Sequence, residues 1–100
     1  MASPTAVDAQ AANRMLQDLP GWSLDPGDKS ISKSYAFKNY YETIAFVNAT
    51  AWISHRADHH PDLIVGYNTC KVTYSTHSTG GLSDLDFACA ADVEKLISAQ

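Results

Sequence analysis

Apolar and polar residues recur along the chain at two spacings, one typical of helices and one typical of strands. Helical spacing marks three segments, residues 4–19, 40–57 and 84–97. In the first segment, the apolar residues at this spacing are Val7, Ala11, Ala12, Met15, Leu16 and Leu19. Ser3 followed by Pro4 predicts the start of this helix, because serine caps helices and proline is favoured at the first helical position.

Alternation of apolar and polar residues predicts a first hairpin after this helix. Trp22–Leu24 is expected to be extended, and Pro26-Gly27-Asp28 has the composition of a turn. Residues 31–37 alternate as a second strand. Lys33 interrupts the apolar side of that strand, so we expect one end of the strand to face water.

A second hairpin follows the middle helix, with strands predicted at 63–67 and 71–76. Asn68-Thr69 between them offers a tight turn. With the turn in this place, His60 lies opposite His77, and the hairpin returns the chain to the corner that it left. The pairing depends on the position of the turn, because a slip in register changes every partner.

The predicted order of elements is α-β-β-α-β-β-α. Hairpins joined by helices favour an α+β fold, with a four-stranded antiparallel sheet and helices packed on one face. A chain of 100 residues predicts a single domain, residues 1–100.

The middle helix, residues 40–57, carries more apolar surface than a surface helix needs. Asn39 is its predicted N-cap, with Glu42 as a variant of the capping box. Its two apolar stripes are Ile44, Val47, Ala51 and Trp52, and beside them Phe46, Ala49 and Ile53. Either the helix lies between two layers or part of it contacts another subunit. We therefore expect a homodimer or a homotetramer.

Composition and charge argue against several functions. The net charge is −4, and the seven Lys and Arg residues are scattered, which argues against binding to a nucleic-acid backbone. No run approaches the roughly 18 apolar residues of a membrane span. Residues 1–4 lack the basic and apolar regions of a secretory signal, so a cytoplasmic location is expected. Cys70 and Cys89 are expected to be buried thiols, and a disulfide is the alternative.

All four histidines lie between residues 55 and 77. Histidine exchanges protons near neutral pH, because its ordinary pKa is about 6.5. His55 precedes His59 by one helical turn, and His59 is followed by His60. Asp86 lies on the buried stripe of the last helix, where a carboxylate needs a partner. Together these residues predict an acid–base site.

Simpler interpretations of the same residues remain open. Asp86 could be only a capping-box residue behind Ser83, and His55 could be a solvated residue near the helix dipole. The spacing of His55 and His59 also suits two metal ligands on a helix. Arg56 stands where a zinc-protease motif has glutamate, however, so no metal is the preferred prediction.

These residues together resemble the signature of the pterin-4a-carbinolamine dehydratase family. The matching positions are His55, His59-His60-Pro61, Tyr67, His77 and Asp86, in a context that includes Asp58, Ser75-Thr76 and Gly81-Leu82-Ser83. The resemblance covers residues 5–97. One departure stands out, because the better-known animal members carry glutamate where this chain has His55.

The resemblance implies a hydro-lyase that dehydrates 4a-hydroxytetrahydropterin to the quinonoid dihydropterin. This reaction recycles the pterin of aromatic amino acid hydroxylases such as phenylalanine hydroxylase, and it requires no cofactor. By resemblance, the catalytic residues would be His59, His60 and His77. The substrate-binding residues would be His55, Pro61, Ser75, Thr76 and Asp86. Animal members also act as dimerisation cofactors of a homeodomain transcription factor, so a non-catalytic interaction role is an alternative.

Overall fold

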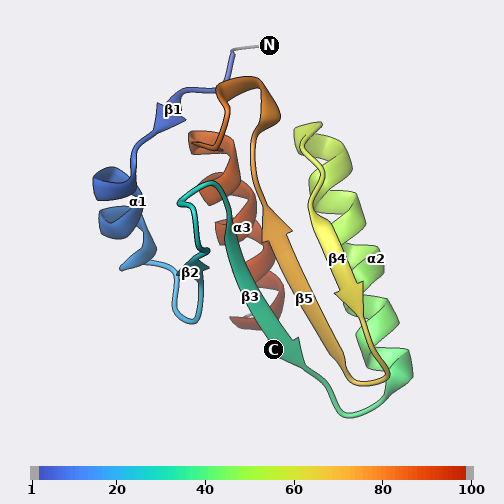
Figure 1. Ribbon diagram of the computed structural model, residues 1–100. Helices are drawn as coiled ribbons and strands as arrows, with labels where there is room; N and C mark the ends of the chain where they lie inside the picture. The colour runs from blue at the N-terminus through green and yellow to red at the C-terminus, as the bar shows by residue number, and fades with distance from the viewer. Residues whose placement is uncertain (1–2, 99–100) are drawn as a thin grey trace.

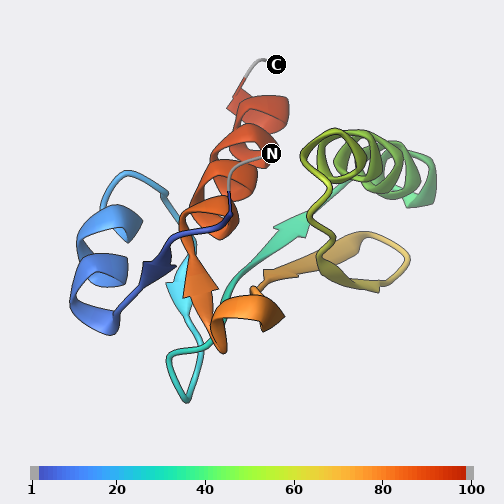
Figure 2. The same ribbon diagram turned by 90° about the horizontal axis from the view of Figure 1, so that it is seen from above.

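The computed structural model describes residues 3–98 and has a four-stranded antiparallel sheet at its centre (Figure 1). The strands run in the order β2-β3-β5-β4. Their bounds are β2 Ser23–Leu24, β3 Ile31–Ala36, β4 Asp62–Val65 and β5 Thr69–Tyr74. The two long helices, α2 (Tyr40–Ala57) and α3 (Asp84–Ser98), both cover one face of this sheet (Figure 2). The predicted fold class is therefore confirmed.

Three short elements complete the structure. Two-residue strands β1 (Ala6–Val7) and β6 (Leu82–Ser83) form a separate antiparallel pair. A 3-10 helix, η1 (His77–Thr79), follows β5. The periodicity of the sequence predicted none of them, because a repeating pattern does not stand out over two or three residues.

The first helix starts later than predicted. Helix α1 spans Ala9–Leu16, and the Asp8 side chain caps it by accepting a 2.8 Å hydrogen bond from the backbone N–H of Ala11. The prediction that Ser3 and Pro4 start the helix was wrong. Val7, which fits the helical stripe, belongs instead to β1 and pairs with Leu82. A long-range strand pairing has overridden a local helix signal.

Helix α2 begins and ends where the sequence predicted, but it presents a different face to the sheet. Asn39 Oδ1 accepts a 2.9 Å hydrogen bond from the Glu42 N–H, so the predicted N-cap is confirmed. The buried residues of the helix are Thr43, Phe46, Thr50 and Ser54. Trp52, placed on the apolar stripe, is 62% exposed. The helix is therefore not enclosed between two layers within this chain.

The second hairpin has a different register from the one predicted, because each β4 residue pairs with a β5 residue two positions earlier in the chain than expected. The Gly66 N–H donates to the Thr69 carbonyl at 2.8 Å, and Val65 pairs with Cys70. The predicted turn at Asn68-Thr69 and the His60–His77 pairing were therefore wrong. The displacement is even, so each side chain stays on its predicted face of the sheet.

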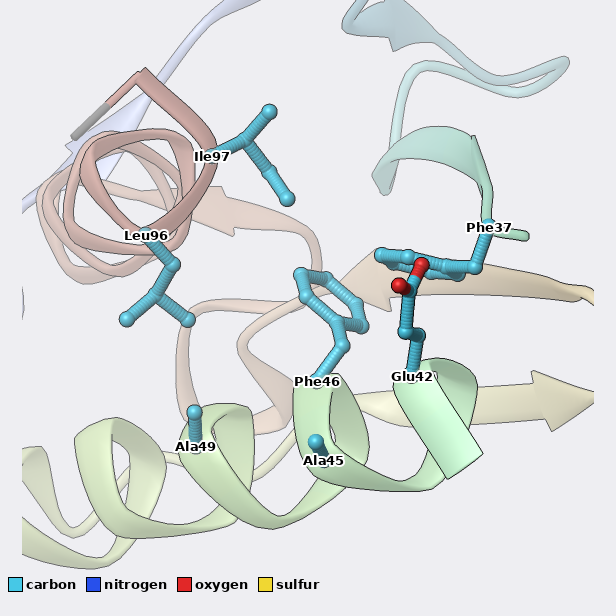
Figure 3. A pocket seen from close by; sticks show the side chains of 7 residues that line it. All are labelled: Phe37, Glu42, Ala45, Phe46, Ala49, Leu96 and Ile97. Carbon is cyan, nitrogen blue, oxygen red and sulfur yellow. The ribbon is translucent and has the colours of Figure 1, made fainter. Parts of the chain in front are cut away.

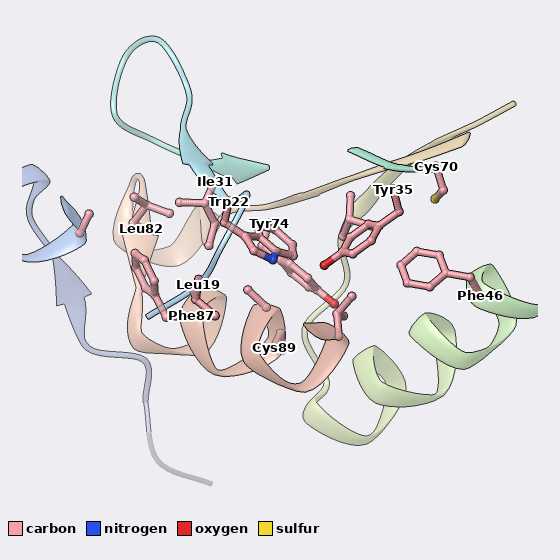
Figure 4. Packing of buried hydrophobic residues seen from close by; sticks show 14 residues of the cluster. Leu19, Trp22, Ile31, Tyr35, Phe46, Cys70, Tyr74, Leu82, Phe87 and Cys89 are labelled. Atoms are coloured by element: carbon pink, nitrogen blue, oxygen red, sulfur yellow. The ribbon is translucent and has the colours of Figure 1, made fainter. Parts of the chain in front are cut away.

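The core lies between the sheet and α3, and aromatic side chains fill much of it (Figure 4). The fully or nearly fully buried residues include Trp22, Ile31, Tyr35, Val72, Tyr74, Phe87, Ala90 and Val93. Cys70 and Cys89 are both free and buried, and burial raises the pKa of the Cys89 thiol to about 11. A disulfide does not form between them in this structure.

Lys33 is partly exposed on β3, and its charge is paired with a residue of α3. Its ammonium group donates to Glu94 Oε1 of α3 at 2.5 Å and to the Pro20 carbonyl at 2.7 Å. Its side chain lies over Gly21, where a Cβ atom would approach Lys33 Cε to 2.7 Å. Gly21 has a φ of +83°, so both the backbone conformation and the lysine favour glycine there. Within residues 3–98, no helix is long and apolar enough to cross a membrane.

Candidate active site

The clearest candidate site is a cleft of about 700 Å³ at the end of the molecule shown uppermost in Figure 1. The end of α2, the segment after β5 and the start of α3 meet there. Three of the four histidines line it, namely His59, His60 and His77. Ser75 and Thr76 line it as well. These five residues were predicted as site residues from sequence, and the fold brings them together.

The end of helix α2 directs His59 and His60 toward this cleft. The helix stops at Ala57, and Asp58 adopts a left-handed conformation with a φ of 51°. The N–H groups of Asp58 and His59 bond back to the carbonyls of His55 and Ser54. This arrangement closes the last turn of the helix and lets the chain change direction. Pro61 then disfavours any return to helical conformation.

Asp86 lies behind His59 and is fully buried. Its Oδ1 lies 2.5 Å from His59 Nε2. Its Oδ2 accepts hydrogen bonds from the Thr76 hydroxyl at 2.8 Å and from the Ser83 backbone N–H at 2.9 Å. Asp86 is thus both the capping-box residue of α3 and the partner of a cleft histidine. Asp86 is therefore more than a capping-box residue, and its role in a site stays a prediction.

The hydroxyl groups around Asp86 form an ordered chain of hydrogen bonds. Because Thr76 donates its only hydroxyl proton to Asp86, the Ser83 hydroxyl must donate to Thr76 across their 2.7 Å separation. Ser83 Oγ in turn accepts from the Leu85 N–H. Each buried oxygen has a partner, so the carboxylate is held in one orientation.

This network assigns the two nitrogens of the His59 ring. If Nε2 carried no proton, its lone pair would face a carboxylate oxygen and the two would repel each other. Nε2 is therefore assigned the proton and donates to Asp86. Nδ1 is then the nitrogen left to exchange a proton with a ligand. The Asp86 carboxylate also stabilises the ring when it is positively charged. His59 is therefore arranged to accept a proton at Nδ1.

Tyr74 supports the His59 ring from the core side. The two rings stack with centroids 5.8 Å apart and planes 13° from parallel. The Tyr74 hydroxyl lies 2.8 Å from Ser54 Oγ, which anchors it to α2. Burial raises the pKa of Tyr74 to about 12, so the phenol is neutral at physiological pH. It positions the histidine without adding charge.

His77 reaches the cleft from the segment that follows β5. It is the first residue of η1, and the bridge between Thr76 and Gly81 closes the loop beneath it. Gly80 ends η1 in a left-handed conformation with a φ of 73°. His60 and His77 are both exposed, whereas only 11% of the His59 side chain is exposed. The cleft therefore combines one anchored histidine with two accessible ones.

Other predicted site residues lie outside the lining of the cleft. His55 is exposed in the last turn of α2, and Pro61 follows the histidines without lining the cleft. Their contact with a substrate stays a prediction. Sequence reasoning missed Pro4 and Leu85, which do line the cleft. Pro4 had been assigned to a helix, so no sequence signal pointed to its place there.

A second hollow of about 310 Å³ lies between α2 and the end of α3 (Figure 3). Phe37, Phe46, Leu96 and Ile97 supply most of its apolar surface. Among the side chains that line it in the described part of the chain, Glu42 is the only ionisable one. This hollow therefore lacks the paired proton-transfer groups of the histidine cleft.

The metal-site alternative has no third ligand to support it. Across residues 3–98, no group of three or more His, Cys, Asp or Glu side chains is arranged to hold a metal ion. His59, one of the two ligands in that alternative, already directs Nε2 at Asp86.

Comparison with known proteins identifies the family to which this chain is similar. The family model described as pterin 4 alpha carbinolamine dehydratase matches residues 5–96. A Nitrosomonas eutropha protein named "Putative pterin-4-alpha-carbinolamine dehydratase" is 56% identical over 94 residues, which cover 94% of this chain and 81% of that protein. A Dechloromonas aromatica protein of the same name is 58% identical over 91 residues, or 91% of this chain and 80% of the relative.

Solved structures agree with these matches. A Brucella melitensis protein described as a transcriptional coactivator/pterin dehydratase superposes with a TM-score of 0.88 and 29% identity. The match covers 92% of this chain and 98% of that one. A pterin dehydratase-like protein described as a RuBisCO assembly factor of the alpha-carboxysome has a TM-score of 0.65 and 27% identity. That match covers 76% of this chain and 88% of the other.

Proposed function

The chain belongs to the pterin 4 alpha carbinolamine dehydratase family, and we propose that it dehydrates a 4a-hydroxytetrahydropterin to the quinonoid dihydropterin. One observation carries this proposal most strongly. Three histidines line a single cleft, and a buried carboxylate holds one of them in a defined orientation. Histidines with a purely structural role are not expected to gather around an open cavity.

The reaction needs one proton donor and one proton acceptor. The hydroxyl group on C4a gains a proton and leaves as water. N5 loses its own proton and forms the new double bond to C4a. The donor ends the step one proton short and the acceptor holds the proton from N5, so proton exchange with solvent restores both groups. Histidine suits both roles near neutral pH, and each role typically accelerates a reaction by about 10²–10⁴-fold.

In this proposal, His59 is the base and His77 is the acid. Asp86 accepts the Nε2 proton of His59, which leaves Nδ1 to take the proton from N5. The same carboxylate stabilises the imidazolium that forms, as an aspartate does in a catalytic triad. His77 has no such buried carboxylate among its described hydrogen-bond partners and lies exposed, where it can exchange protons with solvent. His60 positions the pterin from the same turn.

The remaining predicted residues would hold the pterin ring. Ser75 and Thr76 line the cleft, where they would contact the amide and amino edge of the ring. Pro61 and His55 would complete the substrate-binding set from the α2 side. The product would be reduced elsewhere, in the recycling of the pterin used by an aromatic amino acid hydroxylase such as phenylalanine hydroxylase.

We also propose that the protein assembles as a homodimer or homotetramer. Tyr41 is 82% exposed and Trp52 is 62% exposed on α2. Ile64 and Val65 are exposed on β4, at the edge of the sheet. Edge strands and exposed aromatic residues favour association. Sedimentation at micromolar concentration is expected to give a dimer or tetramer, and a clean monomer would contradict this.

The dehydratase proposal is tested by following the ultraviolet absorbance of the carbinolamine, formed in situ by a hydroxylase. The wild-type protein should accelerate its loss. His59→Ala and His77→Ala should each remove most of the acceleration, by about 10²-fold or more. Lys71→Ala, on an exposed residue of β5 outside the cleft, is the matched control and should retain it. Wild-type rates in both histidine variants would contradict the proposal.

A further inference from the structure

The segment of residues 3–7 runs along the start of α3 and reaches the histidine cleft. In Figure 2, β1 lies beside β6, and the register pairs Ala6 with Ser83 and Val7 with Leu82. Continuing this antiparallel register places Thr5 opposite Asp84, and Pro4 opposite Leu85. Pro4 and Leu85 both line the cleft.

Thr5 and Asp84 form a reciprocal pair of hydrogen bonds. The Asp84 backbone N–H donates to the Thr5 carbonyl at 3.0 Å. The Thr5 N–H donates to the Asp84 side chain, at Oδ1, at 2.8 Å. Helix α3 begins at Asp84, so a side-chain oxygen replaces the main-chain acceptor of a regular ladder. This clamp fixes the residue immediately before it, which is Pro4.

The strand β6 links the segment to the catalytic network. Ser83 pairs with Ala6 on one side and donates its N–H to Asp86 on the other. Its hydroxyl contacts Thr76. One residue thus connects residues 3–7 with the carboxylate that orients His59.

Pro4 and Leu85 supply apolar surface to a cleft whose other walls are rich in polar groups. His59, His60, Thr76 and His77 lie on those walls. A fused heteroaromatic ring has polar edges and apolar faces, so a site for it needs both kinds of surface. Proline is also suited to a fixed wall, because its ring restricts the backbone and it has no N–H to leave unpaired.

We infer that residues 3–7 form part of the substrate site, in which Pro4 and Leu85 pack against the pterin ring and the Thr5–Asp84 clamp holds Pro4 in place. This inference rests on the proposed function of the same cleft. Pro4 is a contact residue for the substrate, and Asp84 is a positioning residue that acts through it. Neither takes part in proton transfer, so they affect the KM for the pterin and leave kcat nearly unchanged.

Three variants test the clamp and the wall. Asp84→Ala removes the side-chain acceptor, whereas Asp84→Asn keeps an oxygen that can accept from Thr5. Pro4→Gly removes the ring that lines the cleft. Asp84→Ala and Pro4→Gly should each raise KM by roughly three- to tenfold, with kcat within about twofold of wild type. Asp84→Asn should stay close to wild type. An unchanged KM in folded Asp84→Ala and Pro4→Gly, or a loss confined to kcat, would overturn the inference.

Hydrogen exchange on the unmodified protein gives an independent measurement. Saturation with 7,8-dihydrobiopterin should slow amide exchange at residues 75–78 and also at residues 5–7. Protection at residues 75–78 without any change at residues 5–7 would overturn the inference and leave the proposed function standing. If the dihydropterin neither binds nor protects any of these amides, the proposed function fails and the inference fails with it.

Discussion

Helix α3 carries two carboxylates, Asp86 and Glu94, that each accept three hydrogen bonds but from different kinds of donor. Asp86 accepts from His59, Thr76 and the Ser83 N–H, near the start of the helix. Glu94, two turns later, accepts from three donors on a single oxygen. Those donors are Lys33 at 2.5 Å, Tyr35 at 2.6 Å and Trp22 at 3.2 Å.

The difference lies in what the donors can do. His59 lines an open cleft and can gain or lose a proton, so Asp86 acts on a group that meets ligands. Lys33 and Tyr35 lie against the core, and burial together with the Glu94 hydrogen bond raises the pKa of Tyr35 further above its ordinary value. Burial of a carboxylate therefore does not identify a catalytic site. Its partner does.

The largest expected effect comes from Asp86→Asn. The amide leaves the side-chain volume nearly unchanged but cannot stabilise a positively charged His59, and one of its two ends now donates. We expect kcat to fall by about 10²-fold or more, with a changed pH profile. Glu94→Gln is the matched variant and should keep kcat within about twofold of wild type. Equal losses of kcat in the two variants would remove the distinction between the carboxylates.

The stability of the fold should depend on the second region, around Glu94. Glu94→Gln removes the negative charge to which Lys33 and Tyr35 both donate. The half-buried Lys33 ammonium is then left without an anionic acceptor. We expect the free energy of unfolding to fall by about 1–3 kcal/mol in urea denaturation. A loss below the error of the measurement would mean that the Glu94 cluster contributes nothing to the fold.

The Glu94 cluster also predicts a dependence of stability on pH. Burial raises the pKa of Glu94, but hydrogen bonds from Lys33 and Tyr35 outweigh it and hold the pKa below its ordinary value of 4.5. Ionised Glu94 therefore stabilises the fold above about pH 4.5, and this contribution is lost as the pH falls through the lower folded pKa. Unfolding curves at pH 3–6 should show a steeper loss in wild type than in Glu94→Gln. Parallel losses would contradict the assigned shift.

Tyr35→Phe should have the smallest effect. It removes one of the three donors to Glu94 and leaves Lys33 in place. We expect about 0.5–1.5 kcal/mol of destabilisation and no change in kcat. A loss of activity in this variant would show that the two regions are coupled, which the separate hydrogen-bond networks do not predict.

The same two regions show what could be predicted from the sequence. The cleft was predictable because its histidines lie close together in the chain, and because an even displacement of the hairpin register kept its side chains on the same faces. The Glu94 cluster was not, since Lys33 and Glu94 are 61 residues apart and a lone lysine on a strand normally indicates solvent. Pro4 was missed for a related reason, because its place depends on the two-residue pairing of β1 with β6.

The most direct test of the proposed site is a crystal structure of the protein with 7,8-dihydrobiopterin. The account predicts that the pterin ring occupies the cleft lined by His59, His60 and His77, with N5 within hydrogen-bond distance of His59 Nδ1 and His59 Nε2 still bonded to Asp86. A ring bound elsewhere, for example in the hollow between α2 and α3, or a ring that leaves Nδ1 of His59 without contact, would contradict it.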